Sequence, residues 1–260
     1  MRRDRTREAR RAGSLPAIAG DDAGAMKLSI LQYGRHPLTG APVPGYVIEL
    51  DDGSIVLVDT GFPTIGPHDR VPARFRVTPD DHVVRRLAIL GLRPRDVRFL
   101  VCSHFDPDHS GSHDLFPGSE CIVQRSHYVV ARSGRDSRFE IHRSRWDHPA
   151  LRYRLVDGDT ELAPGVDLIE TSGHVPGHQS VLVRLPNTGA VLLAVDAIPI
   201  AAQADPHTRR PHPFDADPAR AARSAAKLAE ICEREQVRLI VYGHDAEQWG
   251  TLRLAPACYT

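Results

Sequence analysis

The chain has 260 residues, of which 41% are hydrophobic and 25% are charged, proportions that are typical of a globular protein with room for one large domain. Its 33 basic and 33 acidic side chains cancel, so the net charge gives no support to a nucleic-acid partner, and no run of about 18 apolar residues predicts a membrane span. Four cysteines without a C-x-x-C pair are typical of small core residues in a reducing compartment, which predicts a cytoplasmic protein.

The first 25 residues differ from the rest because arginines crowd their start, and Gly, Ala and Asp follow. The apolar run at residues 15–19 is short and contains Pro16, so it does not match a secretory signal. We therefore expect a flexible Arg-rich extension over residues 1–25 and one folded domain over residues 26–260.

Strands dominate the start of the folded domain. The pattern predicts strands at residues 27–32, 45–50 and 54–59, and an Asp-Gly turn between the last two favours a hairpin. Residues 62–78 are rich in Pro and Gly and form a loop candidate that could cover a site or contact a second copy.

A helix over residues 79–90 follows, with Thr78 as its N-cap and Gly91 at its end. The next predicted elements are strands at residues 97–102 and 120–124 and a helix at residues 126–132. We interpret residues 132–149 as a polar surface segment whose histidines, His142 and His148, are solvated.

The second half predicts more strands and one long helix. The strands are expected at residues 153–156, 166–170, 180–185, 190–195 and 237–242. The helix runs from Pro218 to about residue 235, with Asp215 or Asp217 as the N-cap.

A compact polar motif, residues 103–111, follows the apolar strand at residues 97–102. It places His104, Asp106, Asp108 and His109 within six positions. Two imidazoles and two carboxylates on a tight loop can direct several ligand atoms into one small volume, which is typical of a metal site. The alternative is a solvated loop, because a catalytic metal usually needs at least three protein ligands and this motif must find others elsewhere.

Three further candidates stand at the ends of predicted strands: His174, Asp196 and His244. A lone His or Asp in such a place is more often a turn or core residue. Three of them, each after its own strand, favour a site shared with the motif.

Five pieces of the chain together resemble the metallo-β-lactamase-fold hydrolases and, within them, the N-acyl homoserine lactonases. The pieces are Val58-Asp59-Thr60-Gly61 and residues 103–111, 171–180, 191–197 and 243–245. The resemblance implies an α+β fold, an αββα sandwich in which two β-sheets lie face to face, helices lie outside and the site lies at one edge.

The resemblance also implies two divalent metal ions, zinc first, with manganese or iron as alternatives. One ion would be held by His104, Asp106 and His174, the other by Asp108, His109 and His244, and Asp196 would bridge both. Asp108 would be the catalytic general acid. His178 would support the site without binding metal.

The chain departs from this family at three positions. Asp106 stands where a second His is usual, which shifts the preference toward harder metals such as manganese or iron. Pro107 replaces an aromatic residue of the pocket, and Pro199 replaces a Tyr that binds the substrate carbonyl. These changes leave the choice of substrate open.

The function expected from the resemblance is the opening of a lactone ring by a hydroxide held between two metal ions, with a small lactone or ester as the substrate. Alternatives are hydrolysis of another lactone, ester or phosphotriester, or a fold member that binds metal without catalysis. A nuclease is disfavoured because no basic groove or added domain is indicated. The sequence leaves a homodimer open.

Overall fold

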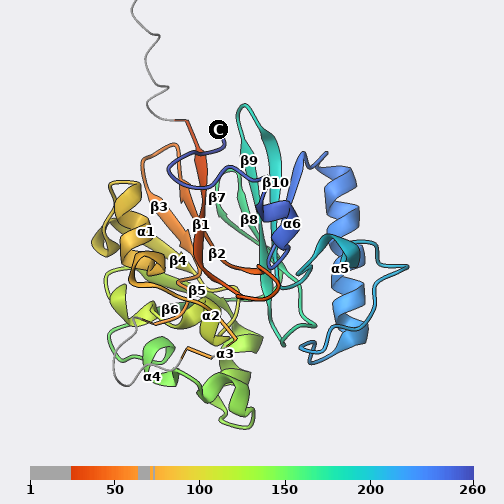
Figure 1. Ribbon diagram of the computed structural model, residues 1–260, viewed down its shortest axis with the longest axis horizontal. Helices are drawn as coiled ribbons and strands as arrows, with labels where there is room; N and C mark the ends of the chain where they lie inside the picture. The colour runs from red at the N-terminus through yellow and green to blue at the C-terminus, as the bar shows by residue number, and fades with distance from the viewer. Residues whose placement is uncertain (1–24, 64–70, 73) are drawn as a thin grey trace, which may run out of the picture.

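The computed structural model describes residues 25–63, 71–72 and 74–260. Two β-sheets pack face to face, and helices cover both outer sides (Figure 1). The expected αββα sandwich of the α+β class is therefore confirmed. The predicted extension lies outside the described residues except for Ala25, and the middle of the predicted loop at residues 62–78 lies outside them too.

The first sheet has six strands in chain order, on the orange-to-green side of Figure 1. They are β1 (Lys27–Arg35), β2 (Pro42–Glu49), β3 (Ile55–Val58), β4 (Val97–Val101), β5 (Glu120–Gln124) and β6 (Arg152–Val156). The first three strands are antiparallel, whereas β3 to β6 are parallel. Parallel strands end at the same edge of a sheet, so the loops after β3 and β4 meet.

The second sheet has the order β11-β10-β9-β8-β7. Its strands are β7 (Thr160–Ala163), β8 (Val166–Glu170), β9 (Gln179–Leu185), β10 (Gly189–Val195) and β11 (Leu239–Tyr242). Only β10 and β11 are parallel. The sequence did not predict β7, because its four residues include only two apolar side chains and are too few to show a strand periodicity.

The main core lies between the sheets and follows the alternation of side chains along each strand. Leu28 and Ile30 of β1 point inward and join Val181 and Val191 of the second sheet in one buried cluster. Leu31, one position further, packs on the outer face instead. Burial of both faces explains the continuous apolar runs of Ile55–Val58 and of residues 190–195.

The helices are α1 (Val83–Ile89), α2 (Pro107–Ser110), α3 (Arg125–Arg132), α4 (Arg143–Trp146), α5 (Pro218–Arg234) and α6 (Ala246–Trp249). Short 3₁₀ turns lie at Pro79–Asp81, Pro94–Asp96, His113–Leu115, Ser137–Glu140 and Ala201–Gln203. In Figure 1, α1 covers the first sheet and α5 covers the second, while α3 and α4 lie together beyond the strand ends.

The predicted helix at residues 79–90 is two elements rather than one. Thr78 caps a 3₁₀ turn because the Asp81 carboxylate accepts hydrogen bonds from its N–H and Oγ1 at 2.9 and 2.7 Å. His82 then takes an extended conformation (φ −63°, ψ 141°), and α1 begins at Val83. The break at His82 ends the single helix that the sequence predicted.

The long helix α5 begins as expected, and the structure decides its cap. The Asp217 side chain accepts a hydrogen bond from the N–H of Arg220 at 2.9 Å, so Asp217 rather than Asp215 is the N-cap. Its apolar face, with Ala225, Leu228 and Ile231, packs on the outer face of the second sheet.

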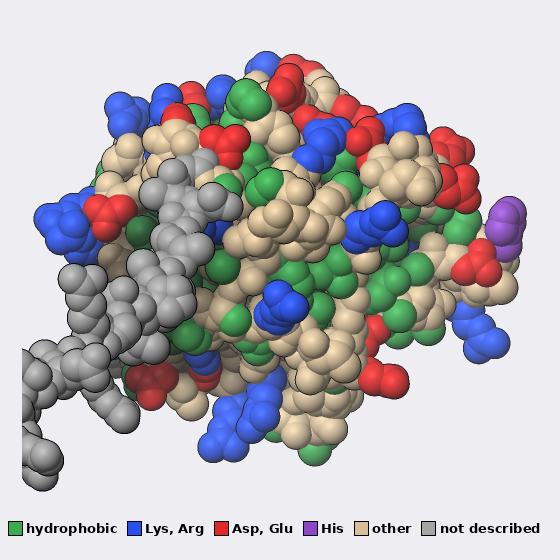
Figure 2. Space-filling model, turned by 90° about the horizontal axis from the view of Figure 1, so that it is seen from above, with side chains coloured by type: hydrophobic (Ala, Val, Ile, Leu, Met, Phe, Trp, Pro, Cys, Tyr) green, Lys and Arg blue, Asp and Glu red, His purple; other side chains and the backbone are tan. Residues whose placement is uncertain are grey.

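Acidic and basic side chains are interspersed over the face shown in Figure 2, with apolar side chains between them. Within the described part of the chain, no helix combines the length and the apolar character that crossing a bilayer requires.

Candidate metal centre

Strand ends from both sheets bring the seven predicted ligands together. The motif residues follow β4 and run into α2, His174 lies after β8, and Asp196 and His244 follow β10 and β11. The seven side chains are those of His104, Asp106, Asp108, His109, His174, Asp196 and His244. The strands that precede them, β4, β8, β10 and β11, end at one edge of the sandwich, and α2, labelled in Figure 1, carries Asp108 and His109 there.

Asp196 lies at the middle of the cluster, and its two oxygens face different sides. Oδ2 lies 3.2 Å from His174 Nε2 and 3.8 Å from His104 Nε2. Oδ1 lies 3.0 Å from His244 Nε2 and 3.5 Å from His109 Nε2. This is the arrangement that a carboxylate bridging two cations needs.

The charges of the cluster favour a cation. Burial opposes ionisation of Asp196, but His244, His109 and His174 hold the pKa of its carboxyl well below its usual value. Burial likewise opposes protonation of His109, yet Asp196 and Asp108 raise the pKa of its imidazole to about 10. A field that draws a proton to these nitrogens also draws a metal ion, which competes with the proton for the same lone pair.

The donor atoms fit divalent ions. Among the described residues, three groups have ligand atoms within 4.8 Å of one another, and two of them consist of predicted ligands: His104, His174 and Asp196, and Asp108, His109 and His244. The third group is His174, His212 and Asp215. His104 Nε2, His109 Nε2 and Asp196 Oδ1 are buried without a hydrogen-bond partner among the described residues. Buried polar atoms are nearly always satisfied, so these three are explained if a metal is their partner.

Asp59 orients His109 and the start of the motif. Its Oδ2 accepts hydrogen bonds from His109 Nδ1 at 2.8 Å and from Ser103 Oγ at 2.6 Å, and its Oδ1 accepts one from the Ser103 N–H at 2.8 Å. Asp59 is fully buried and has φ +60°, a strained conformation for a residue other than glycine. Asp59 lies in Val58-Asp59-Thr60-Gly61, one of the segments that resemble the family, but the sequence assigned it no role. Its position directly after the wholly apolar strand β3 could have indicated that it is a functional carboxylate.

Phe105 anchors the motif from below. Its ring is fully buried and stacks on Trp146, with centroids 4.3 Å apart, and its N–H donates to His127 Nε2 at 2.8 Å. Burial lowers the pKa of His127 to about 4, so this imidazole stays neutral and keeps its acceptor.

His174 reaches the cluster because Gly173 allows α5 to pack closely. Gly173 has φ +143°, and a Cβ there would lie 2.2 Å from the backbone N of Ala221 in α5. Only glycine fits this contact, so α5 and the loop that carries His174 are positioned together.

His244 is oriented by two backbone carbonyls. Its Nδ1 donates to Pro42 O at 2.8 Å, which leaves Nε2 with a lone pair toward Asp196. Its N–H donates to Pro199 O at 2.8 Å. The residue that replaces a substrate-binding Tyr therefore positions a predicted metal ligand through its backbone.

His178 supports Asp196, as the sequence indicated. Its Nδ1 lies 2.8 Å from Thr171 Oγ1, and its Nε2 accepts a hydrogen bond from the Asp196 N–H at 3.3 Å. Burial holds the pKa of His178 well below its usual value, so it remains a neutral acceptor.

Asp106 lies beside His104 and His174, as predicted, but it also forms an ion pair with Arg138. Its Oδ2 lies 3.4 Å from His104 Nε2 and 3.3 Å from His174 Nε2, and the same carboxylate forms a bidentate ion pair with Arg138. The sequence pattern predicted a polar surface segment at residues 132–149, and the contact of Arg138 with Asp106 was not predicted. Nothing in the local pattern around Arg138 separates it from its neighbours.

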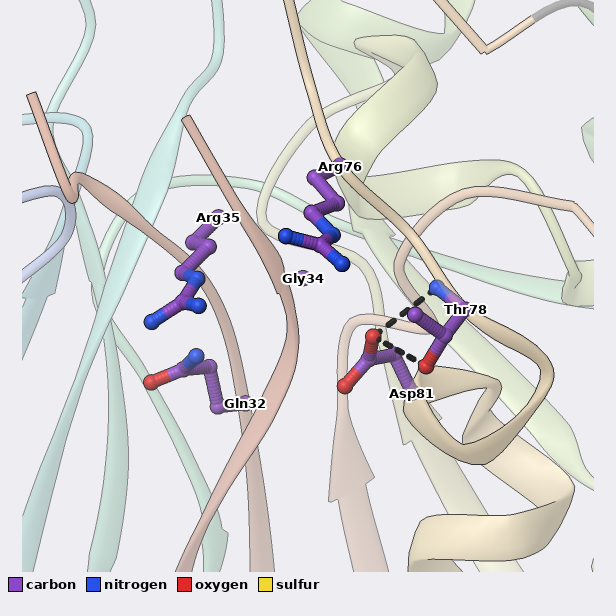
Figure 3. Close-up of a pocket in the computed structure, with 6 residues that line it drawn as sticks. All are labelled: Gln32, Gly34, Arg35, Arg76, Thr78 and Asp81. Atoms are coloured by element: carbon purple, nitrogen blue, oxygen red, sulfur yellow. Dashed lines mark hydrogen bonds between the residues drawn. The ribbon is translucent and has the colours of Figure 1, made fainter. Parts of the chain in front are cut away.

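Two hollows on the described surface lie away from these ligands. One of about 210 Å³ is lined by residues of β1 and of the segment before α1, among them Arg35, Arg76 and Asp81 (Figure 3). Its acid is already paired, since Asp81 accepts from Thr78 and from Arg86 Nη2 at 2.6 Å. The other, of about 660 Å³, includes Asp114 and His148. Neither is lined by a predicted metal ligand.

A family model of the Metallo-beta-lactamase superfamily matches residues 38–244. The chain belongs to this superfamily. Among its relatives, an N-acyl homoserine lactonase of Bacillus thuringiensis is 33% identical over 233 residues, which are 84% of this chain and 87% of that protein. An N-acyl homoserine lactonase AttM of Azorhizobium caulinodans is 34% identical over 69% of this chain and 70% of its own.

A solved structure of an N-acyl homoserine lactone hydrolase has a TM-score of 0.77 and 30% identity, with 90% of this chain and 99% of that chain covered. Its description records the product N-hexanoyl-L-homoserine bound at the catalytic metal center. The chain therefore resembles the N-acyl homoserine lactonases over most of its length. It is a metal-dependent hydrolase of ester bonds.

Proposed function

We propose that this protein opens the ring of a lactone, and that N-acyl homoserine lactones are its substrate class. The observation that carries the proposal is the placement of Asp196, whose two oxygens each face a different pair of histidines. Its relatives support the substrate class: they are named N-acyl homoserine lactonases, and they are 33% and 34% identical to this chain over 84% and 69% of its length. Hydrolysis of N-acyl homoserine lactones would make the protein a degrader of quorum signals.

The metal centre would hold two divalent ions, with zinc as the first candidate and manganese or iron as alternatives. His104, Asp106 and His174 would bind one, Asp108, His109 and His244 the other, and Asp196 both. Divalent ions bound there supply a water of lowered pKa and polarise the ester carbonyl. The first group contains two His and one carboxylate, a donor set that zinc, manganese and iron all accept.

The chain's own groups orient and move protons. Asp59 and Pro42 O fix the Nδ1 protons of His109 and His244, so that both Nε2 atoms face the site. Asp108 is partly exposed at the N-terminal end of α2, with Oδ2 3.8 Å from His109 Nε2. We assign it the proton that the leaving alkoxide needs when the ring opens.

Two prolines at pocket positions favour a second substrate class as the alternative. Pro107 and Pro199 cannot offer the ring contact or the hydroxyl that the family supplies at these places, and Pro199 O is already bound to the His244 N–H. Hydrolysis of another lactone, an ester or a phosphotriester is therefore the alternative function. The homodimer and the cytoplasmic location stay predictions.

Hydrolysis of a substrate panel by metal-reconstituted protein tests the proposal. Protein loaded separately with zinc, manganese and iron would be assayed on acyl homoserine lactones, simple lactones, aryl esters and a phosphotriester. We expect the lactones to be hydrolysed fastest. Asp108→Ala should abolish turnover, whereas the control variant His207→Ala, which changes an exposed histidine, should match the wild type.

Two results would contradict the proposal. Hydrolysis of phosphotriesters or aryl esters without any lactone activity would replace the substrate class. Full activity of Asp108→Ala would show that Asp108 is not the proton donor. A Pro199→Tyr variant that gains turnover of acyl homoserine lactones would show that the missing hydroxyl limits this substrate.

A further inference from the structure

Arg138 reaches into the metal centre from outside the predicted ligand set. It belongs to the 3₁₀ turn Ser137–Glu140, and its guanidinium is mostly buried between the motif and the loop after β8. Nε donates to Asp106 Oδ1 at 2.5 Å, Nη2 donates to Asp106 Oδ2, and Nη1 donates to Phe214 O at 2.8 Å. A planar guanidinium and a carboxylate in this bidentate form make one of the stronger ion pairs in proteins.

The same guanidinium also contacts the metal-facing nitrogen of a second predicted ligand. Arg138 Nη2 lies 2.6 Å from His174 Nε2. The opposite ring nitrogen, His174 Nδ1, has no hydrogen-bond partner among the described residues, and its nearest carboxylate oxygen, Asp215 Oδ1, is 3.7 Å away. Among the polar contacts of the described residues, Arg138 Nη2 is therefore nearer to a ring nitrogen of His174 than the carboxylates of Asp196, Asp106 and Asp215.

A metal ion and Arg138 need the same atoms. A neutral imidazole has one acceptor lone pair at Nε2, which either accepts the arginine N–H or binds a metal. Arg138 Nη2 lies 2.6 Å from His174 Nε2, so it occupies the direction from which a metal ion would have to reach that lone pair. Arg138 keeps its positive charge at any ordinary pH, so it also repels a second cation there.

The other half of the centre carries no such competitor. His109 and His244 each donate Nδ1–H to a fixed acceptor, Asp59 and Pro42 O. Among the described residues, Arg138 has no contact with Asp108, His109 or His244. His109 Nε2, like His104 Nε2, has no hydrogen-bond partner there. The two halves therefore differ in what must be displaced before a metal binds.

We propose that Arg138 is an internal competitor for one of the two metal positions. The position formed by Asp108, His109 and His244 binds its ion first, and the position formed by His104, Asp106 and His174 binds second and more weakly, after Arg138 releases Asp106 and His174. This inference rests on the proposed metal-dependent function. Asp106 and Arg138 form a pair: the carboxylate that replaces a histidine ligand is the group that holds the arginine in place.

A zinc titration of the full chain after chelator treatment tests the inference. Zinc bound per chain would be followed by calorimetry and by elemental analysis after gel filtration. For the wild type we expect two steps whose affinities differ by about 100-fold or more. Arg138→Met should strengthen the second step at least about 10-fold and leave the first unchanged, because only the second position contains the atoms that Arg138 holds.

Two further variants separate competition from a structural role. Arg135→Met, which changes an exposed arginine three residues away, should titrate like the wild type. Asp106→His removes the carboxylate that anchors Arg138 and supplies a neutral donor, so it should also strengthen the second step. If Arg138→Met does not fold, Arg138→Gln, which removes the charge and the bidentate fork but leaves all ligands in place, decides the question by the same titration.

The outcomes separate failure of the inference from failure of the proposed function. Two zinc ions that bind the wild type with equal affinity, or a second step that Arg138→Met leaves unchanged, would overturn competition by Arg138 and leave a metal-dependent hydrolase. A chain that binds no zinc in any variant would overturn the metal centre itself, and the inference with it.

Discussion

Three of the four histidines proposed as ligands have their second ring nitrogen in contact with a polar group. His109 donates to Asp59, His244 donates to Pro42 O, and His104 Nδ1 lies 2.9 Å from Ser103 Oγ. Such contacts fix the tautomer and the ring orientation, so each Nε2 presents its lone pair to the centre of the site. Asp59 has the largest part in this, because it holds both His109 and Ser103.

Asp59→Asn is expected to weaken metal binding without unfolding the protein. The amide oxygen can still accept from the Ser103 N–H, but the amide nitrogen would then face His109 Nδ1 and favour the tautomer whose proton is on Nε2. Partners of this kind typically contribute about 10–100-fold to metal affinity, and we expect a loss in that range. Competition with a chromophoric chelator measures it.

Asp157→Asn is the matched control, since Asp157 is exposed and forms a surface ion pair with Arg125. An affinity of Asp59→Asn equal to that of this control would mean that Asp59 serves the fold and not the ligand.

At the level of elements, the predicted ligands lie in loops after strands or in the short helix α2, and close backbone packing positions these segments. Gly173 lets the loop after β8 contact α5, and Gly243 lets the loop after β11 pass Val195 O, which a Cβ would approach to 2.6 Å. The sequence predicted these strands and α5 because their apolar periodicities are strong. It could not show which glycines mark contacts between elements, since an exposed turn uses the same residue.

Gly173→Ala is expected to destabilise the protein and to lower its metal content. The new Cβ would lie 2.2 Å from Ala221 N at a φ of +143°, so either α5 or the loop that carries His174 has to move. Strain and overpacking of this kind cost about 2 kcal/mol or more. Denaturant unfolding and elemental analysis measure the two effects.

Gly118→Ala provides the comparison, because a Cβ at Gly118 meets nothing within 4 Å. Equal stability of the two variants would show that the contact between Gly173 and α5 relaxes without loss.

At the level of the whole molecule, the metal centre joins the two sheets. Its ligands follow β4 in the first sheet and β8, β10 and β11 in the second. A ligand that binds only the folded chain stabilises it by mass action, about 4 kcal/mol when its concentration is 1,000 times its Kd. Bound metal should therefore hold the sandwich closed at this edge.

Removal of metal with a chelator is expected to lower the midpoint of thermal unfolding, and added zinc should restore it. His109→Ala is the control, because it lacks a proposed ligand and its midpoint should respond little to zinc. A wild-type midpoint that does not respond to chelator or zinc would contradict a metal that links the two sheets.

The sequence by itself predicted the strands and the candidate ligands, and its resemblance to the metallo-β-lactamase-fold hydrolases implied the sandwich. Strand periodicity, the spacing within the motif and the placement of His174, Asp196 and His244 after separate strands are local features, and the structure brings these side chains to one edge. These local patterns did not predict three details: which aspartate caps α5, the break at His82 and the short strand β7.

Only the tertiary structure decided how the centre is held and what competes within it. Asp59 and His109 are 50 positions apart, Arg138 and Asp106 are 32 apart, and His244 and Pro42 are 202 apart. Hydrogen bonds between such distant positions leave no periodic trace, because each depends on how whole sheets and loops pack. For that reason a carboxylate that the sequence offered as a metal ligand is, in the fold, also the anchor of an arginine.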